Sequence, residues 1–173
     1  MALQSQYQRR ADLVPNLVAT VQGYANQEKT VLVAVTQARA SATQVKVDAS
    51  TVTDPAAFQR YAAAQNQLSG VLGRLLAISE NYPDLKSNQN FLALQSQLEG
   101  TENRISVARR DYNESVRDYD TTLRTLPGSL WAGSFYRSAK PMQLFAATAT
   151  AQTTPTVNFA PTAAPTTPAP APK

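Results

Sequence analysis

Residues 91–128, FLALQSQLEGTENRISVARRDYNESVRDYDTTLRTLPG, carry the most regular pattern in the chain. Large side chains recur at every seventh position: Phe91, Leu98, Ile105, Tyr112, Tyr119 and Leu126. The companion positions are mostly small: Leu94, Thr101, Ala108, Ser115 and Thr122. This seven-residue seam predicts a coiled-coil-like helix that packs closely against its neighbours. Pro127 and Gly128 end the pattern, so we expect a helix of about 38 residues, or ~57 Å.

Two earlier segments predict further long helices. Apolar residues recur with helical spacing from about residue 4 to residue 48, and Pro15 inside this pattern should kink the helix or begin a new first turn. A second helix starts at Asp54, a capping residue, and Pro55, and it ends before Tyr82. Three long helices joined by short turns run up, down and up. The sequence therefore predicts an all-α antiparallel bundle.

Three glycines fall inside these predicted helices, Gly70 and Gly73 in the second and Gly100 in the third. Each glycine lowers helix stability by about 1 kcal/mol relative to alanine. We expect them to face neighbouring helices and to permit close contact.

The character of the chain changes after the third helix. The cluster from Trp131 to Tyr136, followed by Arg137 and Lys140, predicts a short C-terminal helix. This helix packs on the open end of the bundle or, alternatively, contacts a membrane surface. Residues 150–173 are rich in Pro, Ala and Thr and are expected to be extended. We therefore predict a bundle domain at residues 1–149 and a tail at residues 150–173.

Composition excludes several kinds of chemistry. The chain has no His and no Cys, which removes the common zinc, haem and iron–sulfur ligands, the Ser-His and Cys-His pairs, and disulfides. It also lacks a Ser-x-x-Lys arrangement and a glycine-rich phosphate loop. We therefore predict that the chain is not an enzyme and has no catalytic, cofactor-binding or metal-binding residues and no small-molecule substrate.

Carboxylates are the remaining candidates for chemistry. Two groups share a helix face: Glu99 with Glu102, and Asp111 with Glu114 and Asp118. Ferritin-like metal sites need Glu-x-x-His pairs, which this chain cannot supply. Surface ion pairs are the favoured interpretation, namely Arg110–Glu114, Glu114–Arg117 and Asp120–Arg124. A hydrolase that uses Glu99 and Glu102 is the weaker alternative. Glu28 is expected at the edge of the bundle or paired with Lys or Arg.

The net charge of +4 does not indicate a nucleic-acid partner. Up to Asp120 the chain has twelve basic and twelve acidic residues, so the bundle lacks the positive surplus that phosphate binding requires. The excess comes from the last four cations, Arg124, Arg137, Lys140 and Lys173. No apolar run approaches the ~20 residues of a membrane-spanning helix. Because the chain opens directly in helical sequence at Gln4, we expect that an N-terminal segment has been removed.

Several stretches resemble the LemA family, in the same order: RRADLVPNLV (9–18), GYA (23–25), ARA (38–40), LGRLLA (72–77), YPDLK (82–86), LEGTENRI (98–105) and ARRDYN (108–113). The resemblance extends over roughly residues 3–159. It implies an antiparallel helical bundle that an N-terminal hydrophobic helix, or a lipidated cysteine in lipoprotein-like members, attaches to a bacterial membrane. Gln27–Glu28 stands where the family often has His-Glu, which weakens any metal or pH-sensing hypothesis there.

Members of that family are not known as enzymes, and one branch is associated with magnetosome membranes. The resemblance thus implies a membrane-anchored, extracytoplasmic domain of the cell envelope. We hypothesise a scaffold that assembles with itself or with an envelope protein. The alternative is an adaptor or regulatory subunit of an envelope enzyme such as a membrane protease.

Overall fold

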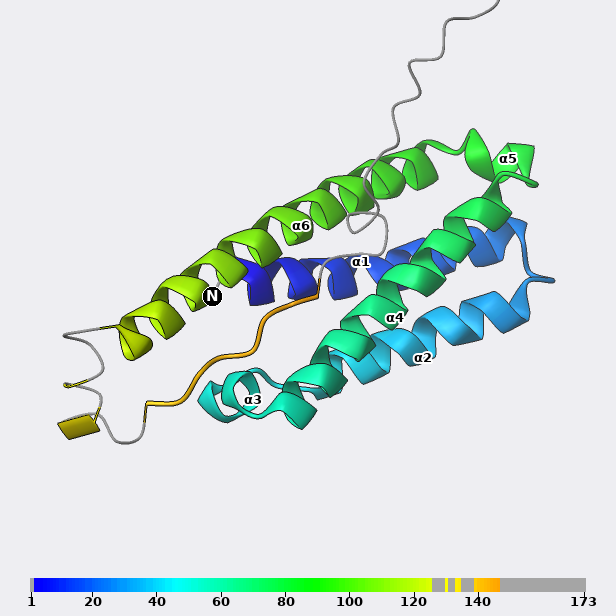
Figure 1. Cartoon of the computed structure of the whole chain (residues 1–173). Coiled ribbons are helices and arrows are strands. Elements are labelled where there is room, and N and C mark those ends of the chain that lie inside the picture. Colours follow the sequence, from blue (N-terminus) through cyan, green and yellow to red (C-terminus); the bar gives the residue numbers. More distant parts are fainter. Residues whose placement is uncertain (1, 126–129, 131–132, 135–138, 147–173) are drawn as a thin grey trace, which may run out of the picture.

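The computed structural model describes residues 2–125, 130, 133–134 and 139–146. The helices are α1 (Ala2–Tyr24), α2 (Lys29–Gln44), α3 (Ala49–Thr53), α4 (Pro55–Ser79), α5 (Pro83–Lys86) and α6 (Gln89–Arg124). Long helices α1, α2, α4 and α6 form an elongated bundle, with α3 and α5 in its connections (Figure 1). The described residues contain no strand, and the predicted all-α class is confirmed.

The first predicted helix is in fact two helices, so the described part has four long helices instead of three. The chain reverses between Tyr24 and Lys29, where backbone hydrogen bonds join Ala25 N to Val21 O (2.8 Å) and Glu28 N to Ala25 O (3.0 Å). This reversal brings the apolar faces of α1 and α2 onto one core. Gly23, a weak helix former, lies just before it.

Pro15 lies inside α1 without ending it. Proline has no N–H, so it leaves the carbonyl of Ala11, four residues earlier, without its helical donor. Arg39 of α2 replaces that donor, because its Nε donates to the Ala11 oxygen at 2.8 Å. The prediction that Pro15 begins a new first turn is therefore wrong, and a neighbouring helix satisfies the freed carbonyl.

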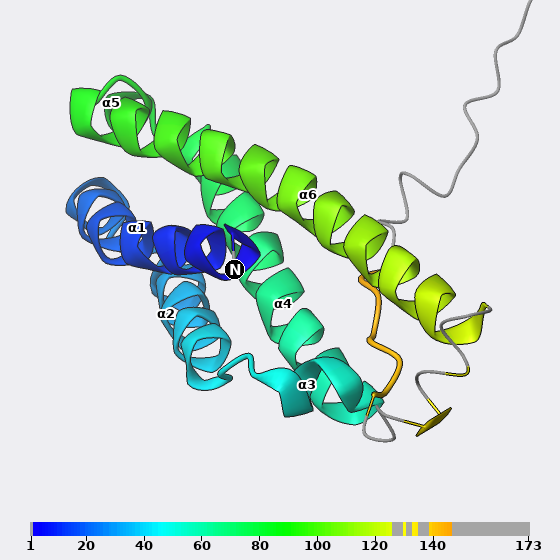
Figure 2. The ribbon, with the colours of Figure 1, turned by 90° about the vertical axis from the view of Figure 1, so that its left-hand side faces the viewer.

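Helix α1 lies between α6 and α2, and α2 packs on α4, as the two views in Figures 1 and 2 show. The backbones of α4 and α6 pack less closely, and α5 joins these helices at one end. Helix α6 extends past the N-terminal end of α1 (Figures 1 and 2). The bundle is therefore closed along three of its helix pairs and more open along the fourth.

The buried apolar residues form two cores. The first, here the turn-end core, lies towards the α1–α2 turn and α5 and contains Val14, Leu17, Val21, Ala25, Val31, Leu32, Val35, Ala38, Ala42, Leu68, Leu72, Leu75, Leu85, Phe91 and Leu98. The second, here the strap-end core, contains Leu3, Tyr7, Phe58, Tyr61, Ile105 and Phe145. Phe145 belongs to residues 139–146, a non-helical segment that we call the strap (orange in Figures 1 and 2).

Local capping explains where several helices begin. Asp54 accepts a hydrogen bond from Ala56 N (2.9 Å) with Pro55 in the first turn of α4, as predicted. Asn88 caps α6 by accepting from Phe91 N (3.0 Å). Asp48 caps α3, and hydrogen bonds from Ser50 and Thr51 lower its pKa to about 2. These short-range signals are legible in the sequence because each needs only neighbouring residues.

The seven-residue seam of α6 is buried in its first half, at Phe91, Leu98 and Ile105. The glycine prediction is wrong, because a Cβ at Gly70, Gly73 or Gly100 would meet no atom within 4 Å. These glycines lie against open space, so close helix contact does not require them. No helix of the described residues is long and apolar enough to cross a bilayer. The predicted short helix at Trp131–Tyr136 and the tail at 150–173 fall on residues outside the described part, apart from Gly133 and Ser134.

Candidate functional site

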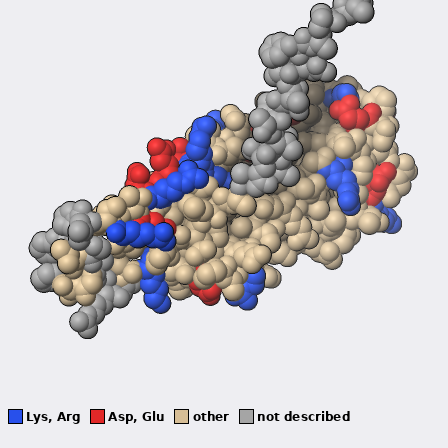
Figure 3. Space-filling view, viewed as in Figure 1, with Lys and Arg blue, Asp and Glu red and all other residues tan. Residues whose placement is uncertain are grey.

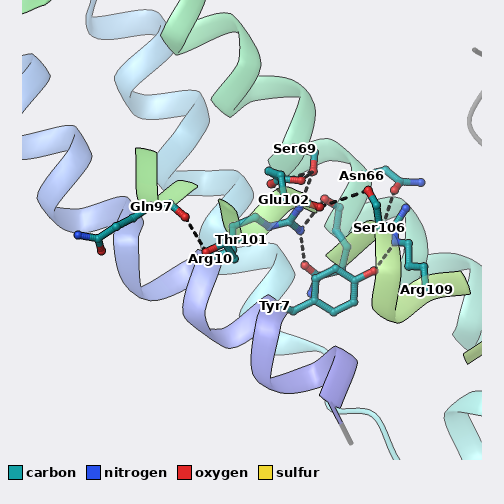
Figure 4. Close-up of polar contacts among 10 residues, drawn as sticks. Tyr7, Arg10, Asn66, Ser69, Gln97, Thr101, Glu102, Ser106 and Arg109 are labelled. Atoms are coloured by element: carbon teal, nitrogen blue, oxygen red, sulfur yellow. Dashed lines mark hydrogen bonds and ion pairs between the residues drawn. The ribbon is translucent and has the colours of Figure 1, made fainter. Parts of the chain in front are cut away.

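A charged side chain lies in the middle of the bundle. Arg10 of α1 is fully buried, and its guanidinium contacts helices α4 and α6 (Figure 4). It donates to the backbone oxygen (2.9 Å) and to Oε1 (2.6 Å) of Gln65, to the Ser69 hydroxyl, and to Glu102 Oε1 (3.0 Å). Ser69 in turn donates to Glu102 Oε2 at 3.1 Å. We call Arg10, Gln65, Ser69 and Glu102 the central polar cluster.

The cluster can hold a buried charge because the guanidinium meets one carboxylate and several neutral acceptors. An unpaired charge in this position would strongly favour the unfolded state. Glu102 keeps about a third of its side chain exposed (35%), so the ion pair lies at the border between protein and solvent. Among the described residues, Arg10 Nε finds no hydrogen-bond partner, so one donor of this buried side chain is left unsatisfied there. The arrangement ties α1 to both α4 and α6.

A second arginine extends the polar contacts towards the strap. Arg109 of α6 donates from Nε to the Tyr7 hydroxyl (2.6 Å) and from Nη2 to Asn66 Oδ1 (2.8 Å), as Figure 4 shows for these three residues. Its guanidinium carbon lies 4.9 Å from the ring centre of Phe145 and 5.6 Å from that of Tyr7. The guanidinium carbon of Arg10 lies 5.2 Å from the centre of the same Tyr7 ring. Tyr7 therefore connects the central polar cluster to the strap-end core.

Burial controls the titration of three tyrosines at this end of the bundle. It raises the pKa of Tyr7, although the neighbouring Arg109 acts in the opposite direction. It also raises the pKa of Tyr61 and of Tyr112 above the ordinary tyrosine value. No described residue hydrogen-bonds to the Tyr61 hydroxyl, so this ring contributes mainly through its aromatic contacts.

Glu28 lies at the other end of the molecule, just before α2 begins. It accepts a hydrogen bond from the Tyr82 hydroxyl (2.8 Å), and Gln27 Nε2 donates to that same hydroxyl (2.9 Å). Of the two expectations for Glu28, the structure agrees with a position at the edge of the bundle, and the described residues form no ion pair of Glu28 with Lys or Arg. Its carboxylate joins the α1–α2 turn to the segment before α5, and Asn88 and Tyr24 add a second link there (2.8 Å).

A cavity of about 450 Å³ lies beside the central polar cluster. Its walls come from α1, from the end of α2 with the segment that follows, and from α4, and they include Gln4, Tyr7, Thr43, Lys46, Tyr61 and Gln65. These side chains offer hydrogen-bond donors and acceptors, but no activated nucleophile lies among them. Within the described residues, no three His, Cys, Asp or Glu side chains come together in a way that could hold a metal ion.

The carboxylates singled out in the sequence have different partners in the structure. Glu102 joins the central polar cluster, whereas Glu99 is exposed and accepts a hydrogen bond from Gln95 (3.1 Å). The three predicted ion pairs of α6 are absent, because the ion pairs of the described residues are Arg10–Glu102 and Lys86–Glu80. Acidic and basic side chains lie beside one another on the face in Figure 3 instead of forming separate patches. Glu99 and Glu102 both line a pocket of about 300 Å³ together with Ser69 and Leu98, so the hydrolase alternative stays a prediction.

Sequence reasoning missed the residue at the centre of the site. Arg10 occupies the apolar face of α1, in register with Tyr7, Val14, Leu17 and Val21. A charged residue at a core-facing position was the available signal. Arg10, Glu102 and Arg109 also lie within three of the stretches that resemble a known family.

Comparisons with known proteins agree with that resemblance. A model of the LemA family matches residues 1–159. The protein LemA of Metamycoplasma hominis is 24% identical over 123 residues, which are 71% of this chain and 52% of that protein. Magnetosome protein MamQ 2 of Paramagnetospirillum magneticum is 31% identical over 64 residues, 37% of this chain and 24% of that protein. Magnetosome protein MamQ of Magnetospirillum gryphiswaldense is 30% identical over 74 residues, 43% of this chain and 27% of that protein.

This chain spans about half the length of the LemA relative and about a quarter of the MamQ relatives. The family model, in contrast, covers nearly all of the chain, including every residue of the central polar cluster and the strap. The match and the all-helical fold lead to one conclusion: the chain belongs to the LemA family.

Proposed function

We propose that this chain is a non-enzymatic helical scaffold of a bacterial cell envelope, held at a membrane and assembling with further copies of itself or with an envelope protein. The observation that carries the proposal is the engagement of its chemically capable side chains in the bundle. Arg10, Glu102 and Arg109 bond to other helices and leave no free acid–base pair at the cluster. Such a chain is better suited to binding other proteins than to catalysis.

The relatives support the membrane part of this proposal. One is named LemA and others are named magnetosome proteins, and the family resemblance implies attachment to a bacterial membrane. We propose that this chain lies on the extracytoplasmic side. Fractionation of cells that produce the natural protein, followed by protease treatment of intact spheroplasts, tests both statements. Recovery in the soluble cytoplasmic fraction contradicts them.

The absolute mass in solution tests self-assembly. Light scattering of the 173-residue chain over a hundredfold range of concentration should give a mass that rises above 18.7 kDa. The rise is expected because self-association depends on concentration. A mass that stays at that of the single chain throughout the range contradicts assembly with itself and leaves assembly with an envelope protein.

An adaptor for an envelope enzyme is the second candidate, and one observation favours it. An apolar groove of about 370 Å³ lies between α1 and α2, with Val18, Leu32 and Val33 among its lining residues. Val33 is 53% exposed, which is high for a large aliphatic side chain. The adaptor hypothesis expects a stoichiometric enzyme to co-purify after gentle extraction and to be lost with Val33→Glu. Unchanged recovery with that variant argues against this groove.

A further inference from the structure

The strap is held to the bundle chiefly through its backbone. Gln143 N donates to Val52 O of α3 (2.9 Å), and the Tyr112 hydroxyl of α6 donates to Gln143 O (3.0 Å). Asn113 of α6 bonds to both backbone groups of Phe145, each at 2.9 Å. Backbone hydrogen bonds of this kind fix the path of the strap and depend little on the identity of its side chains.

One side chain of the strap is the exception. Phe145 is buried among aromatic rings, with centre-to-centre distances of 4.9 Å to Phe58, 5.5 Å to Tyr112, 6.4 Å to Tyr61 and 6.5 Å to Tyr7. These four rings come from α1, α4 and α6, so the strap contributes none of the walls. We call them the aromatic socket. The strap and its socket thus resemble a short peptide bound in a pocket of the bundle.

The connection between the strap and the bundle is long. Helix α6 ends at Arg124, and the strap begins at residue 139. The residues between them can span up to about 45 Å when extended. The end of α6 lies beyond α1, and the strap returns from there between α6 and the start of α4 (Figures 1 and 2). None of the contacts of Phe145 depends on the strap and the socket being in the same chain.

We propose that the aromatic socket of one copy receives the strap of a second copy, so that exchanged straps join molecules of this chain. The inference rests on the self-assembly in the proposed function and names its interface. An exchanged strap makes the same hydrogen bonds and ring contacts as a strap within one chain. Exchange is therefore opposed mainly by the loss of independent motion, and a high local concentration at a membrane reduces that loss.

The absence of cysteine makes a direct test possible. Asp120 Oδ1 accepts a hydrogen bond from Met142 N (3.2 Å), so thiols at these two partly exposed positions lie within reach of a short bismaleimide. Single variants Asp120→Cys and Met142→Cys are purified, mixed at high concentration, incubated and cross-linked. Exchange predicts a covalent heterodimer. Mixing Met142→Cys with Val33→Cys, an exposed position of α2, measures collisional cross-linking.

Phe145 should control the yield of that heterodimer. Phe145→Ala, placed in the Met142→Cys chain, should lower the yield at least about tenfold, because it removes the ring that fills the socket. Leu144→Ala is the matched control, since this neighbouring side chain is 42% exposed and should leave the yield unchanged. Circular dichroism of both variants establishes that the bundle is folded. Equal yields from the two variants overturn the role of the socket.

The double variant Asp120→Cys/Met142→Cys separates the inference from the function on which it rests. If it gives only intramolecular cross-links at concentrations where light scattering finds oligomers, strap exchange is wrong and self-assembly stands. If light scattering finds a single chain and the mixed variants give no heterodimer above the Val33→Cys control, both are wrong. A heterodimer above the control that requires Phe145 supports the exchange.

Discussion

The two cores of this bundle are built in different ways. The turn-end core contains fifteen residues, nearly all aliphatic, and the turns that close it are short in sequence. The strap-end core contains six residues, four of them aromatic, and the residue that completes it comes from beyond the last helix. A core closed by local turns opens only when helices separate, whereas a core closed by a strap can open by losing the strap alone. The first gives the molecule its stability, and the second is the place where it can exchange contacts.

The central polar cluster lies at the boundary between these cores. It occupies positions that could hold aliphatic side chains, so its contribution is better understood as fixing the register of α1 against α4 and α6 than as adding stability. Tyr7 and Arg109 continue the contacts to Phe145. Disturbance of the cluster should therefore affect both cores, while disturbance of either core should affect mainly that core.

The largest effect is expected at Arg10. Arg10→Ala removes the fully buried side chain that ties three helices together and should lower the free energy of unfolding by about 3–5 kcal/mol. Urea unfolding followed by circular dichroism measures this loss. Arg104→Ala, at an exposed position of α6, is the control and should change stability by less than about 0.5 kcal/mol. Similar losses in the free energy of unfolding of the two variants would contradict the structural role given to the central polar cluster.

A pair of truncations compares the cores directly. Leu68→Ala in the turn-end core should cost about 3 kcal/mol, because the cavity lies among packed helices that cannot separate locally. Phe145→Ala should cost less despite the larger side chain removed, because the strap can leave and the bundle remains. Hydrogen exchange followed by mass spectrometry should show faster exchange in the strap and α3 for Phe145→Ala and throughout the bundle for Leu68→Ala. The reverse order of stability losses contradicts the distinction between the two ends.

A smaller effect tests the bond that compensates for Pro15. Arg39→Met keeps most of the side-chain volume but leaves the Ala11 carbonyl without its donor, at an expected cost of about 1–2 kcal/mol. Pro15→Ala restores the helical N–H, so Arg39→Met should cost much less in that background. The four thermal unfolding curves of this double-mutant cycle measure the coupling. Additive losses in stability would show that Arg39 stabilises the protein through a contact other than the Ala11 carbonyl.

The smallest effect at neutral pH is expected for Tyr61→Phe. Burial raises the pKa of Tyr61 in the folded protein, so the unfolded chain loses this proton first as the pH rises above about 10. The stability that depends on the protonated hydroxyl is therefore present below that pH and declines above it. Tyr61→Phe should make the decline shallower by up to about 1.4 kcal/mol per pH unit.

Urea titrations between about pH 8 and pH 11 measure this slope. Tyr7→Phe is the contrasting variant, because it also breaks the bond to Arg109 and should lose stability at neutral pH. If the free energy of unfolding of Tyr61→Phe falls as steeply with rising pH as that of the unchanged chain, the strap-end core is more hydrated than the structure indicates.

Local patterns predicted much of this fold, and long-range pairings escaped prediction. The span of α6, the start of α4 at Asp54 and Pro55, and the all-α class follow from periodicity and capping. The sequence signals the break between α1 and α2 only weakly. The reversal is favoured by the core that both helices share, and local spacing does not reveal that core. The exposed positions of Gly70 and Gly73 could not be recognised from the sequence. Helix propensity gives the loss of helix stability at a glycine, but it does not say which atoms lie opposite that glycine.

The central polar cluster escaped prediction for the same reason. Arg10 and Glu102 are far apart in the chain, and helical spacing grouped Glu102 only with Glu99 on one face of the helix. Only the packing of α1 between α6 and α2 shows that the Arg10 position is enclosed. The resemblance to the LemA family located the correct stretches of sequence without assigning a structural role to either residue.

The sequence separation of 92 residues between Arg10 and Glu102 also has a consequence for biosynthesis. Helices α1, α2 and α4 leave the ribosome before α6, and they can form local hairpins while the rest is being made. The guanidinium stays hydrated during that time, because its carboxylate partner does not yet exist. Desolvation of the middle of α1 therefore waits for the arrival of α6. Helix α1 is synthesised before the other helices of the bundle, yet it is among the last of them to be fully enclosed.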